Sequence, residues 1–301
     1  MRPKELFNLC KKAVQAWSDD YAPSMGAAIS YYTMFSIAPL LLIVIAVAGY
    51  LFGEEAVRGE IVEQLGGLMG KDAAAGVQAL LANASQPEKG MVAGIIGAGV
   101  LVVGATTVFA ELQSALDRIW HVSREDKRGG ALAMLWARML SFGLILGLAF
   151  LMMVSLVVSA FLAALGSWVG ALLPGWEFLL QVINLAVAFA TMTLLFGMIY
   201  KYMPSTRIAW RDVWVGAAVT SLLFQVGKTA IALYLGRSGM TEAFAAAGSL
   251  VAVLAWVYYA AQIFLLGAEF TKVYAQEHGS MKHKVLAPVQ DPPQASTPSS
   301  L

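Results

Sequence analysis

Six long apolar segments alternate with shorter polar segments along this chain of 301 residues. They cover approximately residues 27–52, 91–115, 132–165, 178–202, 213–235 and 244–273. Each is long enough for the ~20 residues that an α-helix needs to cross a ~30 Å hydrocarbon core. The pattern therefore predicts an all-α fold, a polytopic membrane bundle of six transmembrane helices.

The basic residues are divided unevenly between the two sets of connecting segments. Of the 20 Lys and Arg residues, 15 lie in the N-terminus, the second and fourth loops and the C-terminus, when Arg138, Lys201 and Lys272 at the adjoining ends of spans are counted with them. Only four lie in the first, third and fifth loops, and one, Lys228, lies inside a span. Because short cytoplasmic loops are enriched in Lys and Arg, this division predicts that both termini are cytoplasmic.

Composition supports a membrane protein, since 59% of the residues are hydrophobic and only 13% are charged. That is too little polar surface for a soluble domain of this length. The single Cys10 excludes an internal disulfide and a cysteine-based metal cluster. We expect no cofactor and no metal ion.

Three regions are predicted along the chain. Residues 1–26 form a cytoplasmic N-terminal region with an amphipathic helix, which either lies on the inner leaflet or packs under the bundle. Residues 27–274 form the six-span membrane domain. Within it, 53–90 is a periplasmic loop of two short helices with a break at Gly66, Gly67 and Gly70. Residues 275–301 form a Pro-rich cytoplasmic tail that is predicted to be disordered.

Polar side chains collect in the inner third of the predicted spans, where each is costly unless it has a partner or a function. Glu111 lies 20 residues into the second span and Glu269 lies 25 residues into the sixth, so both reach the cytoplasmic side. The candidate residues of a cytoplasm-facing polar cavity are Glu111, Glu269, Gln262, Thr107, Tyr32 and Ser36. Arg118, Arg138 and Lys201 would form its basic rim. The alternative is a set of ion pairs that lock the helix ends together.

Two polar residues lie nearer the outer face. Lys228 lies 15 residues into the fifth span, and Asn184 enters the fourth span from the outer side to a similar depth. A contact between them is geometrically possible, and the alternative is that Lys228 extends to the outer headgroups.

The sixth span contains a further group of residues with a predicted orientation. Trp256, Tyr258, Gly267 and Glu269 are expected to face the bundle, because a carboxylate among acyl chains has no partner. Gly267 beside it would allow another helix to approach closely.

Several stretches together resemble the YihY/BrkB family of bacterial inner-membrane proteins. Residues 107–122 (TVFAELQSALDRIWHV) resemble the family's Leu-Gln…Leu-Asn-x-Ile-Trp segment. Residues 200–204 resemble its Tyr-Lys…Pro turn, and residues 248–269 resemble its closing Trp-x-Tyr…Gly-Ala-Glu signature. The run at 30–40 also fits. Asp117 departs from the more usual Asn, and Ala255 from the usual Leu.

The resemblance implies a multi-pass protein of the bacterial inner (plasma) membrane without an established molecular activity. The family is linked with envelope traits such as serum resistance and lipid traffic, and it was formerly labelled ribonuclease BN. The residues do not support that label, because metal-dependent phosphodiester cleavage needs clustered His and carboxylate ligands. The chain holds only three His residues, and two of them lie near its C-terminal end. We therefore predict neither an enzyme nor a nucleic-acid partner.

Two functions remain open from the sequence. The first is a permease or translocase for a lipid-like or small anionic solute in envelope homeostasis, with membrane lipids as partners and anionic lipid at the cytoplasmic rim. The second is a non-catalytic membrane scaffold or accessory subunit, in which the same polar residues only join helices. The sequence does not determine the oligomeric state.

The predicted topology can be tested with reporter fusions. Alkaline phosphatase fused within residues 53–90 is expected to be active, and the same enzyme fused to the C-terminus is expected to be inactive, because the basic residues place these segments on opposite sides. The reverse pattern of activity would refute the predicted orientation.

Overall fold

The computed structural model describes residues 3–84, 107–122, 158, 176–237 and 248–282, and the regular elements in these ranges are helices. The labelled helices are α1 (Pro3–Asp19), α2 (Ala22–Phe52), α3 (Glu54–Met69), α4 (Lys71–Ala84), α7 (Trp176–Tyr202), α8 (Trp210–Arg237) and α10 (Gly248–Glu277). A further helical segment covers residues 107–119 and is called the 107–119 helix below.

Four of the described helices are long and apolar enough to cross a membrane. They lie within α2, α7, α8 and α10, over Ala22–Ala46, Phe178–Tyr202, Trp210–Ile231 and Gly248–Glu277. These match the predicted first, fourth, fifth and sixth spans. Apart from residue 158, the predicted span 132–165 lies outside the described residues, as does the part of 91–115 before residue 107.

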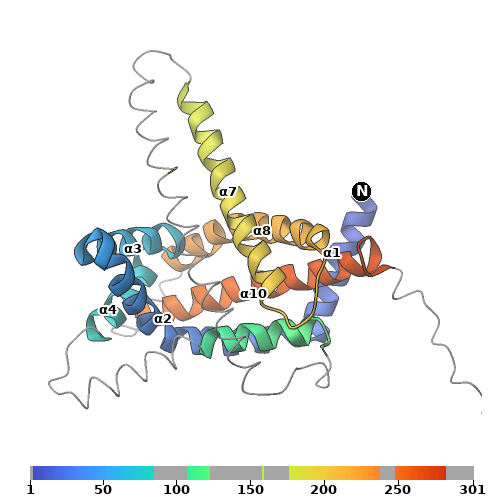
Figure 1. Cartoon of the computed structure of the whole chain (residues 1–301), viewed down its shortest axis with the longest axis horizontal. Coiled ribbons are helices and arrows are strands. Elements are labelled where there is room, and N and C mark those ends of the chain that lie inside the picture. Colours follow the sequence, from blue (N-terminus) through green and yellow to red (C-terminus); the bar gives the residue numbers. More distant parts are fainter. Residues whose placement is uncertain (1–2, 85–106, 123–157, 159–175, 238–247, 283–301) are drawn as a thin grey trace, which may run out of the picture.

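Helices α2, α8 and α10 run alongside one another, whereas α7 crosses them and its N-terminal half projects away (Figure 1). Helix α1 lies across one end of this group. Its Leu9 and Ala13 are buried against Phe270 and Val273 of α10. Of the two placements that the sequence left open for the N-terminal helix, the structure therefore has the one in which it packs against the bundle.

Helices α3 and α4 pack at the other end and are separated at a single glycine. Gly70 has a φ of +85°, a left-handed conformation that favours glycine, and it ends α3. The predicted break at Gly66 and Gly67 is wrong, because α3 continues through both residues. Gly76 of α4 brings that helix onto α10, since a Cβ there would lie 2.7 Å from the Ser249 carbonyl oxygen.

Three helices meet closely around Gly267 of α10. The Tyr200 hydroxyl of α7 donates a hydrogen bond of 2.7 Å to the Phe264 carbonyl oxygen and lies 3.1 Å from Thr220 Oγ1 of α8. A Cβ at Gly267 would lie 1.9 Å from that Thr220 oxygen. The absent side chain therefore makes room for a hydrogen-bonded junction of α7, α8 and α10.

The predicted inward face of the sixth span is confirmed for three of its four residues, since Trp256 packs edge-to-face on Phe224 of α8. Gly267 and Glu269 are buried, and Trp256 is half-buried. Tyr258 is 38% exposed, so the prediction that it faces the bundle is wrong. Its position on the helix turns it away from the Gly267 junction.

The Gly267 junction predicts an unusual response to alanine. Glycine to alanine in a helix interior normally stabilises by up to ~1 kcal/mol. We expect Gly267→Ala instead to destabilise the protein by ~1–3 kcal/mol, because the new methyl group would overlap Thr220 and force a backbone shift. Thermal unfolding in detergent measures the effect. Gly59→Ala is the matched control, since a Cβ at Gly59 meets nothing within 4 Å. Equal stability of the two variants would contradict the close approach.

Candidate functional site

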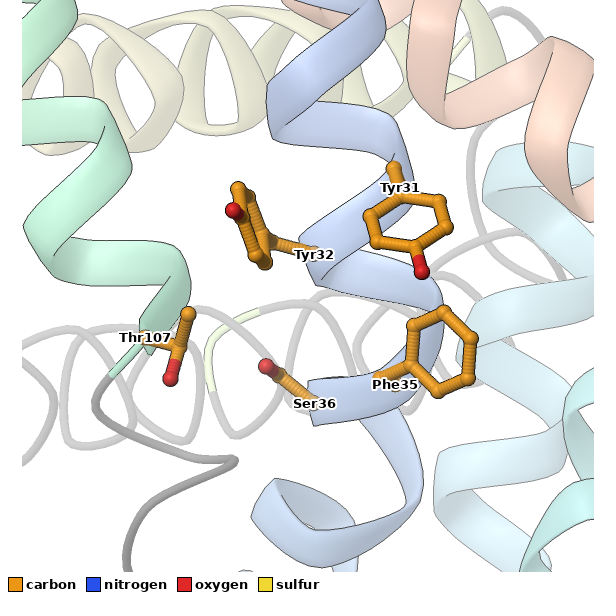
Figure 2. Close-up of a pocket in the computed structure, with 5 residues that line it drawn as sticks. All are labelled: Tyr31, Tyr32, Phe35, Ser36 and Thr107. Carbon is orange, nitrogen blue, oxygen red and sulfur yellow. The ribbon is translucent and has the colours of Figure 1, made fainter.

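A groove of about 260 Å³ opens between α2 and the 107–119 helix (Figure 2). It is lined by Tyr31, Tyr32, Phe35, Ser36 and Thr107. The surface of this groove is mainly apolar, with hydroxyl groups contributed by both helices. Ser36 Oγ is buried and has no hydrogen-bond partner within the described structure. A buried hydroxyl without a partner is costly, so this atom is suited to a polar group entering the groove.

Aromatic rings form one wall of the groove. The ring centroids of Tyr31 and Phe35 lie 4.9 Å apart, and those of Tyr31 and Tyr32 lie 5.6 Å apart in an edge-to-face arrangement. Both spacings are within the range of favourable aromatic pairs. Figure 2 shows Tyr32 and Ser36 on the side of α2 that faces Thr107. The arrangement suits an apolar or amphipathic ligand better than a compact ion.

A stripe of polar residues leads away from the groove along the 107–119 helix. Thr107, Glu111, Ser114 and Arg118 follow one another at helical spacing and therefore share a face within about 60° of arc. All four are half-buried or exposed, and the opposite face is buried against the bundle through Val108, Ala115, Leu116 and Ile119. We call these four polar residues the polar stripe. It extends over about 16 Å from the groove to the end of the helix.

A second group of polar residues lies at the end of the bundle where α1 meets α2. Lys272 Nζ of α10 lies 2.9 Å from Asp20 Oδ2 and 3.2 Å from Glu269 Oε2. His121 Nε2 lies 3.0 Å from Asp20 Oδ1. We call Asp20, His121, Glu269 and Lys272 the ion cluster. It joins the α1–α2 turn, the segment after the 107–119 helix and α10.

Local backbone geometry positions the ion cluster. Asp20 precedes Tyr21, whose φ of 57° makes the sharp turn between α1 and α2. His121 has a φ of 49° directly after the 107–119 helix. Glu269 and Lys272 are three residues apart on α10 and so share one face of that helix. Two turns and one helix face therefore bring the four side chains together.

The contacts of Asp20 determine its protonation. Burial alone would raise the pKa of this carboxyl group, but hydrogen bonds with Glu269, Lys272 and His121 outweigh that effect. Together with the positive charge of Lys272 they lower the pKa from 3.8 to about 2. Asp20 is therefore ionised at neutral pH, and its charge offsets that of the buried ammonium.

Other polar contacts close the same end of the bundle. Asp117 Oδ1 accepts a hydrogen bond of 2.8 Å from the Ser205 backbone N–H, and Asp212 Oδ2 accepts one of 3.0 Å from the Ser280 N–H. Lys12 of α1 pairs with Glu277 of α10. These contacts hold the helix ends, as the ion-pair alternative from the sequence describes.

The residues predicted for one polar cavity occupy two separate places. Tyr32, Ser36 and Thr107 line the groove, and Glu111 lies on the polar stripe. Glu269 is fully buried in the ion cluster and does not line the groove.

Direct packing of α2 on α10 separates the two places. Gln262 donates a hydrogen bond of 3.4 Å to the Pro23 carbonyl oxygen. A Cβ at Gly26 would lie 2.0 Å from Gln262 Nε2. The two helices therefore touch where the sequence placed a common cavity, so Gln262 lies in a helix contact.

The residues predicted for the basic rim of the cavity, and the two polar residues predicted near the outer face, also lie apart from one another. Arg118 is exposed on the polar stripe, whereas Arg138 lies outside the described residues. Lys201 donates to the Ile208 carbonyl oxygen and lies 5.6 Å from the centre of the Trp210 ring. Lys228 is half-buried on α8, and Asn184 is exposed on α7.

Sequence reasoning missed the association of Asp20, His121 and Lys272, and the part that Phe35 takes in the groove. The three-residue spacing of Glu269 and Lys272 on one helix face could have predicted their ion pair. Asp20 and His121 lie in turns, whose conformation no periodicity predicts. Within the described ranges, no three His, Cys, Asp or Glu side chains are grouped so that they could hold a metal ion.

The lowered pKa of Asp20 predicts a pH-dependent stability. A carboxyl group whose pKa is lowered by folding stabilises the folded protein at pH values above its pKa in the unfolded chain, here about 3.8. This stabilisation is lost as the pH falls through the folded-state pKa of about 2. We expect Asp20→Asn to lower stability at pH 7 by ~1–2 kcal/mol, with allowance for solvent screening. The difference from the unmodified protein should disappear between about pH 4 and pH 2. Thermal unfolding in detergent at stepped pH measures it.

Asp19→Asn is the control for this experiment, because Asp19 is exposed and adjacent in sequence. If both variants unfold at the same temperature at neutral pH, the ion cluster does not contribute to stability through Asp20.

Comparison with known proteins identifies the family. A family model described as virulence factor BrkB matches residues 13–290. A UPF0761 membrane protein of Verminephrobacter eiseniae is 31% identical over 257 residues, which are 84% of this chain and 58% of the relative. One from Ralstonia nicotianae is 26% identical over 263 residues, which are 86% of this chain and 57% of the relative. A Klebsiella pneumoniae relative is 33% identical over 177 residues, 58% of each chain.

The chain spans a little under six-tenths of the length of these curated relatives. No solved structure matches. The relatives and the apolar helices together indicate a multi-pass bacterial membrane protein. With the family model covering most of its length, this chain belongs to the BrkB virulence-factor family, as its resemblance to the YihY/BrkB proteins predicted.

Proposed function

We propose that this protein is a permease or translocase that moves a lipid-like amphiphile or a small anionic solute across the inner membrane in envelope homeostasis. The observation that carries the proposal is the continuity of the groove with the polar stripe. Thr107 belongs to both, so an apolar binding surface passes directly into a polar surface on the same helix. In this proposal the protein binds and moves its substrate without chemical change and needs no cofactor.

The groove would hold the apolar part of the substrate. Tyr32 lies about 15 Å along α2 from its N-terminus, and Thr107 lies about 18 Å from the end of the 107–119 helix. Measured from the predicted span ends at residues 27 and 115, the depths are about 8 Å and about 12 Å, so the groove would lie in the cytoplasmic half of the hydrocarbon core, among acyl chains. The Ser36 hydroxyl would supply a hydrogen bond to a polar group passing this level.

The polar stripe would guide the headgroup. A helix face directed toward acyl chains is normally apolar, because polar groups there have no partners. The stripe instead has a hydroxyl, a carboxyl group, a second hydroxyl and a guanidinium in order from the groove to the helix end. Arg118 at that end would attract an anionic headgroup by about 1 kcal/mol, as basic residues do at a membrane surface.

A membrane scaffold or accessory subunit is the second candidate. The ion cluster favours it, because Asp20 and Lys272 join elements far apart in the chain and account for much of the buried charge. In this case the groove would be a packing defect, and the exposed polar stripe would contact another protein. The two candidates differ in whether the isolated protein moves a substrate.

A lipid translocation assay tests the proposal. The purified protein is reconstituted into liposomes that contain phosphatidylglycerol with a fluorescent acyl chain, and dithionite quenches the label in the outer leaflet. We expect protein-dependent exchange between leaflets. Arg118→Gln should slow it by roughly fivefold, which corresponds to the loss of about 1 kcal/mol of attraction for the headgroup.

Arg211→Gln is the matched control, because Arg211 is also an exposed basic residue at this end of the bundle but lies outside the stripe. We expect its rate to stay unchanged. Slowing by both variants would indicate a general surface-charge effect. A folded protein that produces no exchange in this assay would favour the scaffold.

The double variant Glu111→Gln with Glu269→Gln separates the two candidates in cells. Normal accumulation of folded protein with loss of function favours transport, because the carboxyl groups are then not needed for folding. Loss of the folded protein favours a structural role. Membrane fractionation followed by size-exclusion chromatography measures accumulation.

A further inference from the structure

The four residues of the ion cluster form a continuous chain from the surface to the interior. The side chain of His121 is 65% exposed, that of Asp20 is 16% exposed, that of Lys272 is 8% exposed and that of Glu269 is 0% exposed. Adjacent members lie 3.0 Å, 2.9 Å and 3.2 Å apart. One end of the chain can exchange protons with solvent, and the other end is a carboxyl group inside the bundle.

The charges of the cluster do not balance when His121 is neutral. Asp20 and Glu269 together contribute two negative charges against the one positive charge of Lys272. A buried charge without compensation is strongly unfavourable, so the cluster has a place for one more proton. That proton balances the cluster either as an imidazolium on His121 or as a carboxylic acid at Glu269.

Glu269 is the member whose surroundings favour holding that proton. Both of its oxygens are buried and neither accepts a hydrogen bond, although Lys272 Nζ lies 3.2 Å from Oε2. A carboxylate normally satisfies several acceptor sites when it is buried. A carboxylic acid needs fewer acceptor contacts, and the Asp20 carboxylate, which pairs with the same Lys272 ammonium, supplies an acceptor on the same side of α10.

Charged groups on the surrounding elements have other partners. Lys12 of α1 pairs with Glu277, Asp117 accepts hydrogen bonds from Ser205, and Asp212 of α8 accepts them from Ser280.

On α7, Lys201 donates to the Ile208 carbonyl oxygen, and Tyr200 donates to that of Phe264. Asp19 and Arg118, which are close to the cluster in sequence, are exposed. The protonation of the cluster is therefore governed mainly by its own four members.

We propose that Glu269 is a proton-binding site that is loaded from solvent through His121 and Asp20, with Lys272 as the fixed cation. A proton from water binds His121 Nδ1, His121 passes its Nε2 proton to Asp20 Oδ1, which lies 3.0 Å away, and Asp20 transfers a proton to Glu269. His121 is neutral again at the end, Lys272 stays charged throughout, and the cluster has gained one positive charge. The ligand is a proton and not a metal cation, because the Lys272 ammonium already occupies the position between the two carboxyl groups.

The proton site does not depend on the proposed transport. If both are correct, proton binding at Glu269 supplies a means of coupling substrate movement to the proton gradient, since the same α10 face contacts the α1–α2 turn that leads into the groove helix. Proton binding is measured on the folded protein without any substrate, so failure of one proposal leaves the other intact.

Infrared difference spectroscopy on the 301-residue chain in nanodiscs tests the site, with the proton itself as the probe. We expect a carboxylic acid C=O band that decreases as the pH is raised and that shifts in D₂O. Glutamate labelled with ¹³C in the unmodified protein should shift the band, which assigns it to Glu without any substitution. Glu269→Gln should remove it, and Glu277→Gln on the same helix should leave it unchanged.

The loading path is tested separately at the exposed end. His121→Gln should slow exchange of the Glu269 proton for deuterium by roughly tenfold or more, because it removes a proton-transfer group. His278, which stacks on Tyr274, is the control position: His278→Gln should not change the exchange rate. Absence of the band at every pH, its persistence in Glu269→Gln, or no shift with labelled glutamate would overturn the proton site. Unchanged exchange in His121→Gln would overturn the path.

Discussion

The pairing of Lys272 with Asp20 is the interaction on which much of this end of the structure depends. Lys272 is only 6% exposed, and an ammonium ion in such a position is strongly unfavourable unless a charge of opposite sign lies beside it. Asp20 supplies that charge from the turn between α1 and α2, at 2.9 Å. The pairing thereby fixes the direction in which the chain enters α2, and α2 forms one wall of the groove. His121 adds the 107–119 helix, which forms the other wall.

Glycine determines how closely the helices approach elsewhere. At Gly267, three helices meet around the Tyr200 hydroxyl, and at Gly26 the backbone of α2 meets the Gln262 side chain of α10. In a membrane, apolar side chains gain little from contacting each other instead of lipid, so close packing and hydrogen bonds between helices carry more of the association. The contact at Gly26 separates the groove from the ion cluster, so the apolar surface and the buried charged site remain distinct.

The groove and the ion cluster also differ in what they can contribute to function. The groove combines aromatic surface with the buried Ser36 hydroxyl, which has no partner among the described residues, and this combination suits a ligand with an apolar part. The cluster has almost no volume but an uncompensated charge, which suits a proton. Membership of the BrkB family does not decide between transport and scaffolding. Experiments that distinguish these two functions therefore have to probe the groove and the ion cluster directly.

The sequence alone determined the features that depend on local properties. Hydropathy predicted the spans within α7, α8 and α10 to within a few residues, and the spacing of apolar residues from Leu6 to Trp17 predicted an amphipathic N-terminal helix. The residues of that helix that pack on α10 are Leu9 and Ala13, and Leu9 was not part of the predicted face. From the constant rise per residue the sequence also predicted similar depths for Glu111, Glu269 and Tyr32. The structure instead places Glu269 beside the start of α2, where Lys272 pairs with Asp20, and Tyr32 lies farther along that helix. Tertiary structure decided the rest. Whether two residues at one depth face each other depends on the rotation of each helix about its axis, which distant contacts such as Gly26 with Gln262 fix. Glu269 therefore pairs with Lys272 and Asp20 and does not line the groove, because helix rotation and packing are properties of the assembled bundle and not of any one segment.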